Sequence, residues 1–189
     1  MILHITQDEF RLAYAHAEKL AEYVFRSDVN HQYSSLDNAW AHYYGTIGEL
    51  ILHKVFNQPI PAQIDCAAIV NDKGIDFRFG KWKFQVKTRT QLYPETWLHV
   101  LESDLHLIKK VHGIILVSRG STDLEWVVPG YSRSDDFLAH AQPLPEHIAK
   151  SGKPSLGIIA QPEWNGVFRP MSQLLAALGI RPQYLPGFY

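Results

Sequence analysis

Residues 75–87 contain two short runs in which apolar and polar side chains alternate, and Gly80 and Lys81 separate the two runs. Alternation with a period of two indicates two half-buried β-strands. A glycine-first pair of residues between such runs predicts a two-residue hairpin turn with glycine at its first central position. That turn fixes the register of the two strands, and with it the residues that share a face.

The predicted register places Asp76 directly opposite Gln85. Apolar side chains would occupy one face: Ile75, Phe77, Phe79, Trp82, Phe84 and Val86. Polar side chains would occupy the other: Asp76, Arg78, Lys83, Gln85 and Lys87. Because directly opposite residues have Cβ atoms about 4.5–5.5 Å apart, the hairpin gathers a carboxylate, an amide and an ammonium. Phosphodiester cleavage with a divalent metal needs this set of groups.

The same region is basic. It holds six of the 18 Lys and Arg residues of the chain: Lys73, Arg78, Lys81, Lys83, Lys87 and Arg89. Asp72 and Asp76 are the acidic residues among them, so residues 72–89 carry about +4 in a chain whose net charge is −1. Arg78 would face Lys83, and like charges directly opposite each other are destabilising. We interpret the region as a phosphate-contacting surface; the alternative is a solvated strand face.

Composition is typical of one globular domain. The 189 residues are 46% hydrophobic and 20% charged, which allows a core of its own. There is neither a basic region followed by an apolar run at the N-terminus nor an apolar run of about 18 residues, so we expect a cytoplasmic protein without membrane contact.

The single cysteine, Cys66, excludes an intrachain disulfide and a multi-cysteine zinc site. We expect it to be a small buried hydrophobe.

Apolar spacing predicts two helices in the N-terminal third, over residues 7–26 and 36–56. Thr6 and Glu9 have the spacing of a capping box at the first of them. A short strand is expected near residues 67–70, before the hairpin.

The second half of the chain has shorter patterns. Residues 97–101 fit either a strand or the entry to a short helix that continues to residue 110. We expect further strands over 113–118, 124–128 and 156–160, the second of them ended by Pro129 and Gly130, and helices over 134–141, capped at Ser134, and 171–178. This order indicates an α/β domain with a mixed central sheet.

The second predicted helix contains Gly45 and Gly48, followed directly by Glu49. Glycine inside a helix costs about 0.8–1 kcal/mol relative to alanine, so two within four positions suggest close approach to a sheet or another backbone. Glu49 on a helix packed against the hairpin would reach Asp76. Two alternatives remain: a surface Glu on an amphipathic helix, or a transition-metal site formed with His42 and His53.

These residues together resemble the PD-(D/E)XK nuclease superfamily, which includes restriction endonucleases, Holliday-junction resolvases and DNA-repair nucleases. The resemblance rests on Glu49 in a Gly-x-x-Gly-Glu context, on Gly74-Ile75-Asp76, and on Gln85-Val86-Lys87. It is closest to the Mrr-type branch, in which Gln-x-Lys replaces the commoner Glu-x-Lys. It covers residues 36–118 and implies an αβββαβ restriction-endonuclease-like core, preceded by the helix over 7–26 and followed by an extension over 119–189.

The resemblance implies a Mg²⁺-dependent DNA endonuclease. Asp76 would be the central metal ligand, supported by Glu49, by the Gln85 amide oxygen and by the backbone carbonyl of Val86. Lys87 would orient or help deprotonate the attacking water and offset charge on the phosphate. Mg²⁺ prefers such oxygen donors, and Mn²⁺ is the alternative because the neutral Gln85 removes one negative charge. Contacts to DNA would come from Lys73, Arg78, Lys81, Lys83 and Arg89.

The neutral amide of Gln85 leaves a second class of function open. This is a catalytically inactive nuclease-fold module that binds nucleic acid or a partner nuclease subunit. A third reading is a subunit that becomes active only within a restriction or repair complex, since no separate target-recognition domain is evident. A homodimer would place two sites on a two-fold axis for cutting both strands, and the aromatic C-terminal region would then either pack within one protomer or form the dimer contact.

Substitution Gln85→Glu tests the ligand role directly. We expect Mg²⁺ to bind more tightly to this variant in calorimetric titrations, because a carboxylate replaces a neutral amide. An unchanged affinity would argue against Gln85 as a ligand.

Overall fold

The computed structural model describes residues 1–27, 36–60, 75–90, 96–145, 154–160 and 166–181. The predicted strand near 67–70, Cys66 and Lys73 lie outside these ranges. The described chain combines helices and strands in a mixed α/β arrangement. No helix in these ranges is both long and apolar enough to cross a membrane.

The central sheet is mixed, as the sequence predicts. Its strand order is β1-β6-β5-β3-β2, and β9 pairs with a second stretch of β6. β3 and β5 run parallel, whereas their neighbours run antiparallel. The strands are β1 (Ile2–His4), β2 (Phe77–Phe79), β3 (Trp82–Arg89), β5 (Gly113–Arg119), β6 (Glu125–Arg133) and β9 (Arg169–Pro170).

A second, smaller sheet has the order β4-β8-β7. Its strands are β4 (Trp97–Leu101), β8 (Ser155–Ile159) and β7 (Gln142–Pro143). The segment after β4 continues as a 3₁₀ turn, η1 (Glu102–Asp104), and a short helix, α4 (Leu105–Ile108). The two readings of residues 97–110 are therefore both correct in part, because a strand is followed by a helical segment.

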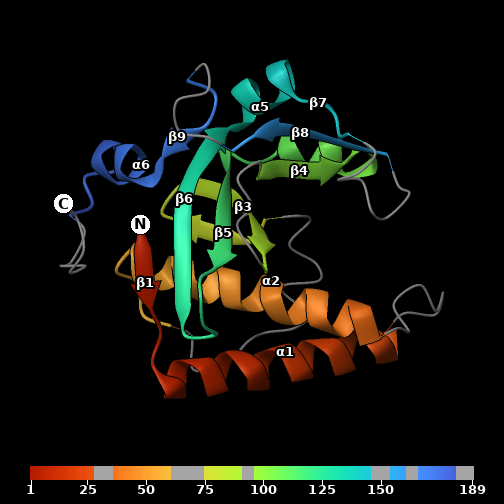
Figure 1. Ribbon diagram of the computed structural model, residues 1–189, viewed down its shortest axis with the longest axis vertical. Helices are drawn as coiled ribbons and strands as arrows, with labels where there is room; N and C mark the ends of the chain where they lie inside the picture. Colours follow the sequence, from red (N-terminus) through yellow and green to blue (C-terminus); the bar gives the residue numbers. More distant parts are fainter. Residues whose placement is uncertain (28–35, 61–74, 91–95, 146–153, 161–165, 182–189) are drawn as a thin grey trace.

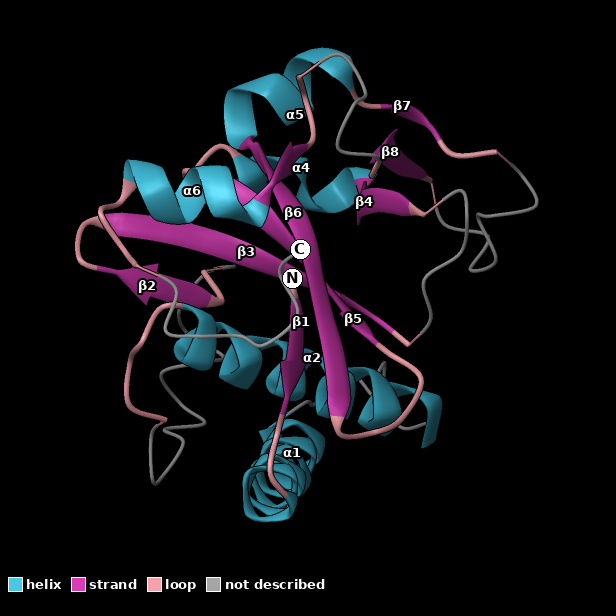
Figure 2. Ribbon diagram, turned by 60° about the vertical axis from the view of Figure 1, so that its left-hand side comes forward, coloured by secondary structure: helices cyan, strands magenta, loops and turns pink. Residues whose placement is uncertain are grey.

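Helices cover the central sheet on both sides (Figures 1 and 2). Figure 1 shows α1 (Gln7–Ser27) and α2 (Leu36–Val55) side by side at one end, with α5 (Ser134–His140) and the second sheet at the other. α6 (Met171–Ala177) packs against β6 and β9. These bounds agree with the predicted helices to within a residue or two.

The central sheet separates two apolar cores. Along β5, Ile115 and Val117 point to the core under α1 and α2. Ile114 and Leu116 point to the opposite core, which β4, β8, α4 and α5 complete. The strand is buried on both faces, as its uninterrupted apolar run predicts.

The hairpin forms in the predicted register. Phe77 pairs with Phe84, Arg78 with Lys83, and Phe79 with Trp82. Gly80 has a φ of 56° and Lys81 does not have a positive φ, which is the pattern of a type II′ turn. Regular pairing begins at Phe77, so Asp76 lies immediately before β2.

The predicted end of a strand at Pro129 is wrong, because β6 continues through it to Arg133. The pairing of β5 with β6 shifts by one residue between Leu116 and Ser118, opposite Pro129. Such a bulge accommodates a residue that has no N–H to donate. Just beyond it, a Cβ on Gly130 would lie 2.1 Å from the Arg169 carbonyl oxygen, so the absent side chain admits β9.

The two predicted helix caps differ in outcome. Thr6 and Glu9 form a reciprocal capping box, since the Thr6 N–H donates to Glu9 Oε2 (2.7 Å) and the Glu9 N–H to Thr6 Oγ1 (3.2 Å). Ser134 does not cap α5. Its hydroxyl donates instead to the Val111 carbonyl (2.8 Å) and ties the helix start to the segment before β5.

The two glycines of α2 also differ. A Cβ on Gly48 would lie 2.0 Å from Thr88 Oγ1, so the helix approaches β3 as predicted. A Cβ on Gly45 would have no neighbour within 4 Å. Close approach therefore explains Gly48 and does not explain Gly45.

Gly48→Ala and Gly45→Ala form a matched pair for measuring that approach. We expect Gly45→Ala to stabilise the protein by about 0.5–1 kcal/mol through helix propensity. Gly48→Ala should instead destabilise it by about 1–3 kcal/mol, because the new methyl group overpacks against Thr88. Urea denaturation measures both, and adding Thr88→Ala should recover part of the loss. Equal effects of the two glycine substitutions would contradict the packing argument.

Candidate functional site

Asp76 is held at the open edge of β3, beyond the first residue of β2. Its N–H donates to the Phe84 carbonyl (3.0 Å), and its Oδ2 accepts a hydrogen bond from the Val86 N–H (2.7 Å). These two contacts place Asp76 alongside residues 84–86 of β3. The regular pairing of β2 with β3 begins at Phe77, so the direct pairing of Asp76 with Gln85 stays a prediction. The carboxylate also lies against the backbone of Val86.

Glu49 reaches the same place from α2. Burial raises the pKa of Glu49 well above its ordinary value, and the negative charge of Asp76 raises it further. The Gly48–Thr88 approach explains this placement, because it brings the adjacent turn of α2 onto β3. Two carboxylates from separate elements therefore share one partly buried environment.

Lys87 and Gln85 extend from β3 toward the second core. Burial lowers the pKa of Lys87, while the negative charges of Asp76 and Asp104 oppose that shift and Arg89 adds to it. Gln85 is 4% exposed, and its Oε1 has no hydrogen-bond partner within the described part of the chain. A buried amide oxygen without a partner is costly unless a ligand satisfies it.

Arg89 belongs to the interior of this site. Its Nη2 donates to the Trp97 carbonyl (3.3 Å) and contacts both ring nitrogens of His99, with Nε2 at 2.8 Å. Burial, together with the positive charges of Arg89 and Lys87, lowers the pKa of His99 to about 4. A neutral imidazole can accept from the guanidinium, so His99 and Trp97 fix Arg89 between the two sheets.

The other residues of the predicted phosphate surface lie on the hairpin. Arg78 and Lys81 are exposed, and Lys83 is partly exposed. Arg78 lies directly opposite Lys83, as predicted. The Lys81 ammonium lies 5.7 Å from the centre of the Trp82 ring, a cation–π distance.

The donor set of the cluster suits a hard divalent cation. It contains the carboxylates of Glu49 and Asp76, and oxygen ligands are those that Mg²⁺ prefers. Gln85 carries an unpartnered oxygen on β3, between the two residues that Asp76 contacts. A cation would also relieve the repulsion between Glu49 and Asp76. No group of three or more His, Cys, Asp or Glu side chains in the described ranges is arranged to hold a metal.

The alternative site on α2 is not supported by the side chains that are described. His53 packs edge-on against Phe77, with ring centres 5.3 Å apart. Burial lowers the pKa of His53, and a hydrogen bond with the Pro59 carbonyl partly offsets that effect. The side chain of His42 lies outside the described set.

Comparisons with protein-family models, with curated proteins and with solved structures found no match. The geometry of the site is therefore the basis for inferring its function.

Sequence reasoning did not anticipate His99, Asp104 or the internal position of Arg89. A signal for Arg89 was present, since the alternation of β3 continues from Gln85 through Lys87 to residue 89. For His99 there was none, because it comes from a strand of the other sheet.

Glu49→Gln tests the strained carboxylate pair in metal-free protein. Because the folded-state pKa of Glu49 lies above its ordinary 4.5, the folded protein holds this proton more tightly than the unfolded chain does. Wild-type stability should therefore fall as the pH rises from about 4.5 through the folded-state pKa. We expect Glu49→Gln to lack this loss and to be the more stable protein at neutral pH, in urea titrations with EDTA.

The exposed Glu18 provides the control. Glu18→Gln should keep the wild-type pH dependence. A Glu49→Gln variant less stable than wild type at neutral pH would show that Glu49 is not a destabilising buried charge.

Proposed function

We propose that the protein is a metal-dependent DNA endonuclease with a restriction-endonuclease-like fold. The observation that carries this proposal is the meeting of Glu49 from α2, Asp76 from the hairpin and Lys87 from β3 in one electrostatic cluster. The unpartnered Gln85 oxygen from the same strand adds a third oxygen donor to the set.

The order of elements supports the proposal. Along the chain α2, β2, β3, β4, α4 and β5 follow one another, which is the order of an αβββαβ core, although β4 pairs in the second sheet. The parallel pairing of β3 with β5 requires a crossover connection, and α4 lies in that connection.

Each residue of the cluster has a role set by its chemistry. Asp76 and Glu49 would hold a cation between them, Gln85 would add its amide oxygen, and Val86 would add its backbone carbonyl. When bound, Mg²⁺ supplies polarisation of the phosphate and a lowered pKa for a bound water. Because Gln85 is neutral, we expect weak Mg²⁺ binding, with Mn²⁺ as the alternative metal.

Lys87 would act on the reacting groups. Its ammonium lies in a partly buried position close enough to Asp76 to interact electrostatically. A fixed positive charge in such a place offsets negative charge on a phosphate more effectively than one in bulk water. Lys87 would also orient the attacking water through its N–H donors.

DNA is the partner that the basic hairpin favours. Arg78, Lys81 and Lys83 lie on the strands next to the cluster, where they would contact backbone phosphates. A homodimer would bring two such sites to the two strands of a duplex.

The alternative is a nuclease-fold module that binds nucleic acid or a partner subunit without cutting. Gln85 favours it, because a neutral amide occupies the position of an acidic ligand. Glu49 and Lys87 favour catalysis, since a binding module would have no need of a buried carboxylate pair beside a buried ammonium.

The test is cleavage of supercoiled plasmid and of branched DNA with Mg²⁺ and with Mn²⁺, using wild type beside Asp76→Asn. We expect wild type to cut with at least one of the metals. Asp76→Asn should lose at least about a hundredfold in rate, because the central ligand loses its charge. Its amide oxygen can still accept the Val86 N–H, so the fold should remain intact by circular dichroism.

Asp8→Asn is the matched control. Asp8 lies on the surface of α1 with a side chain that is 93% exposed, so cleavage by this variant should equal that of wild type. Cleavage by Asp76→Asn at the wild-type rate would overturn the mechanism. Absence of cleavage by wild type with either metal, combined with tight DNA binding, would favour the module.

A further inference from the structure

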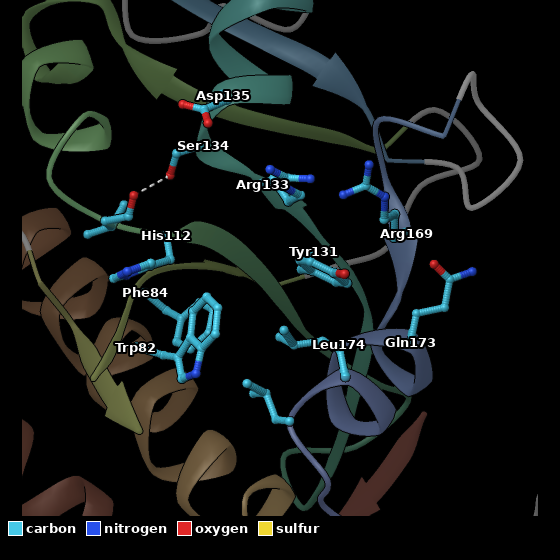
Figure 3. Close-up of a pocket in the computed structure, with 13 residues that line it drawn as sticks. Trp82, Phe84, His112, Tyr131, Arg133, Ser134, Asp135, Arg169, Gln173 and Leu174 are labelled. Carbon is cyan, nitrogen blue, oxygen red and sulfur yellow. Dashed lines mark hydrogen bonds between the residues drawn. The ribbon is translucent and has the colours of Figure 1, made fainter. Parts of the chain in front are cut away.

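A cavity of about 610 Å³ opens where β3 and β5 begin and β6 ends (Figure 3). Figure 3 shows Trp82, Phe84 and His112 on one side of it, Arg169 and Gln173 on the other, and Tyr131 and Arg133 between them. The volume falls within the range of about 300–1,000 Å³ that is usual for pockets that bind small molecules.

One side of the cavity is aromatic. Trp82 lies edge-on to His112, with ring centres 4.9 Å apart. His112 Nδ1 accepts a hydrogen bond from the Lys83 N–H (3.1 Å), so a neutral His112 ring carries its proton on Nε2. The Lys83 carbonyl in turn accepts a hydrogen bond from the backbone N–H of His112 (2.8 Å). Both contacts hold the aromatic side of the cavity in place.

The other side is cationic. Arg169 Nη2 lies 2.8 Å from Asp136 Oδ2, and Arg133 Nε lies 4.0 Å from the same oxygen. The oxygen nevertheless makes no aligned hydrogen bond within the described residues. Two guanidinium groups thus share one carboxylate, which offsets one of their two positive charges. An anion would bind through the N–H donors that do not face Asp136.

Two further charges complete the surroundings. Asp135 lies at the rim next to Ser134, away from Arg169 in Figure 3, so an anion would favour the arginine side. The Lys81 ammonium lies 5.7 Å from the Trp82 ring centre and adds positive charge to the aromatic side.

We propose that this cavity binds one nucleotide unit, with its base against Trp82 and its phosphate at Arg133 and Arg169. Aromatic rings stack on bases irrespective of sequence, and guanidinium groups bind phosphate through paired hydrogen bonds. The unit comes either from a free mononucleotide or from the 5′-phosphorylated end of a DNA strand.

The cavity is distinct from the Glu49–Asp76 cluster. Trp82 and Lys87 are five residues apart on β3, which corresponds to about 16 Å along a strand. The side chains of Trp82 and Lys87 also belong to opposite faces of β3, because Trp82 packs with the core under α2 whereas Lys87 interacts with Asp104. Nucleotide binding therefore does not depend on the proposed cleavage activity.

Calorimetric titration of the whole protein in EDTA tests the proposal without a contribution from a metal. We expect deoxyadenosine 5′-monophosphate to bind and deoxyadenosine to bind at least about tenfold more weakly, because it lacks the phosphate. A 5′-phosphorylated tetranucleotide distinguishes the two sources. Tighter binding than that of the mononucleotide assigns the site to a strand end, and equal or weaker binding assigns it to the free nucleotide.

Variants place the binding in the cavity. Arg133 has a side chain that is 58% exposed, so Arg133→Gln should fold normally and weaken mononucleotide binding about tenfold or more. Trp82→Leu should weaken mononucleotide binding at least about fivefold. If Trp82→Leu impairs folding, Trp82→Phe replaces it as the test and should keep part of the affinity. The exposed Arg11 on α1 supplies the matched control, and Arg11→Gln should bind as wild type does.

Three results would overturn the proposal. They are the absence of mononucleotide and tetranucleotide binding to wild type, wild-type affinity in both Arg133→Gln and Trp82→Phe, and loss of binding in Asp76→Asn. The last result would move the nucleotide to the carboxylate cluster. Nucleotide binding that persists in a protein without nuclease activity would support the cavity while removing the proposed function.

Discussion

The hydrogen bond from the Val86 N–H to the Asp76 carboxylate is the contact on which the candidate site depends. It lies at the edge of β3 beyond the first residue of β2, so a side chain takes the place of the partner strand there. The same bond positions the negative charge that adds to the effect of burial in raising the pKa of Glu49 and that opposes the lowering of the pKa of Lys87. One backbone donor thus connects the pairing of the hairpin to the electrostatics of three elements.

Local stereochemistry explains which parts of the fold were predictable. The hairpin register follows from a period of two and from a glycine that accepts a positive φ, and both are properties of neighbouring residues. The continuation of β6 through Pro129 was not predictable, because the bulge depends on how β5 pairs with it. The separate β4-β8-β7 sheet was missed for the same reason, since β4 and β8 pair across more than fifty residues of sequence.

Some residues of the candidate site were likewise predictable from local patterns, and others were not. Glu49, Asp76, Gln85 and Lys87 were identified because a hairpin and a helix carry them at short spacings. His99 and Asp104 reach the site from the connection between β3 and β5, whose path no local pattern specifies. The cavity was missed because Arg133 and Arg169 are far apart in the sequence and meet through the pairing of Tyr131 with Arg169.

The approach of Arg169 to Arg133 depends on Gly130. The two residues of β9 are admitted beside β6 at the point where Gly130 has no side chain, and Arg169 is one of them. Any larger residue at position 130 would displace the backbone that carries this arginine, although position 130 has no charge of its own to lose. Gly130 carries no charge, and yet its small size determines where the charge of Arg169 lies in the cavity.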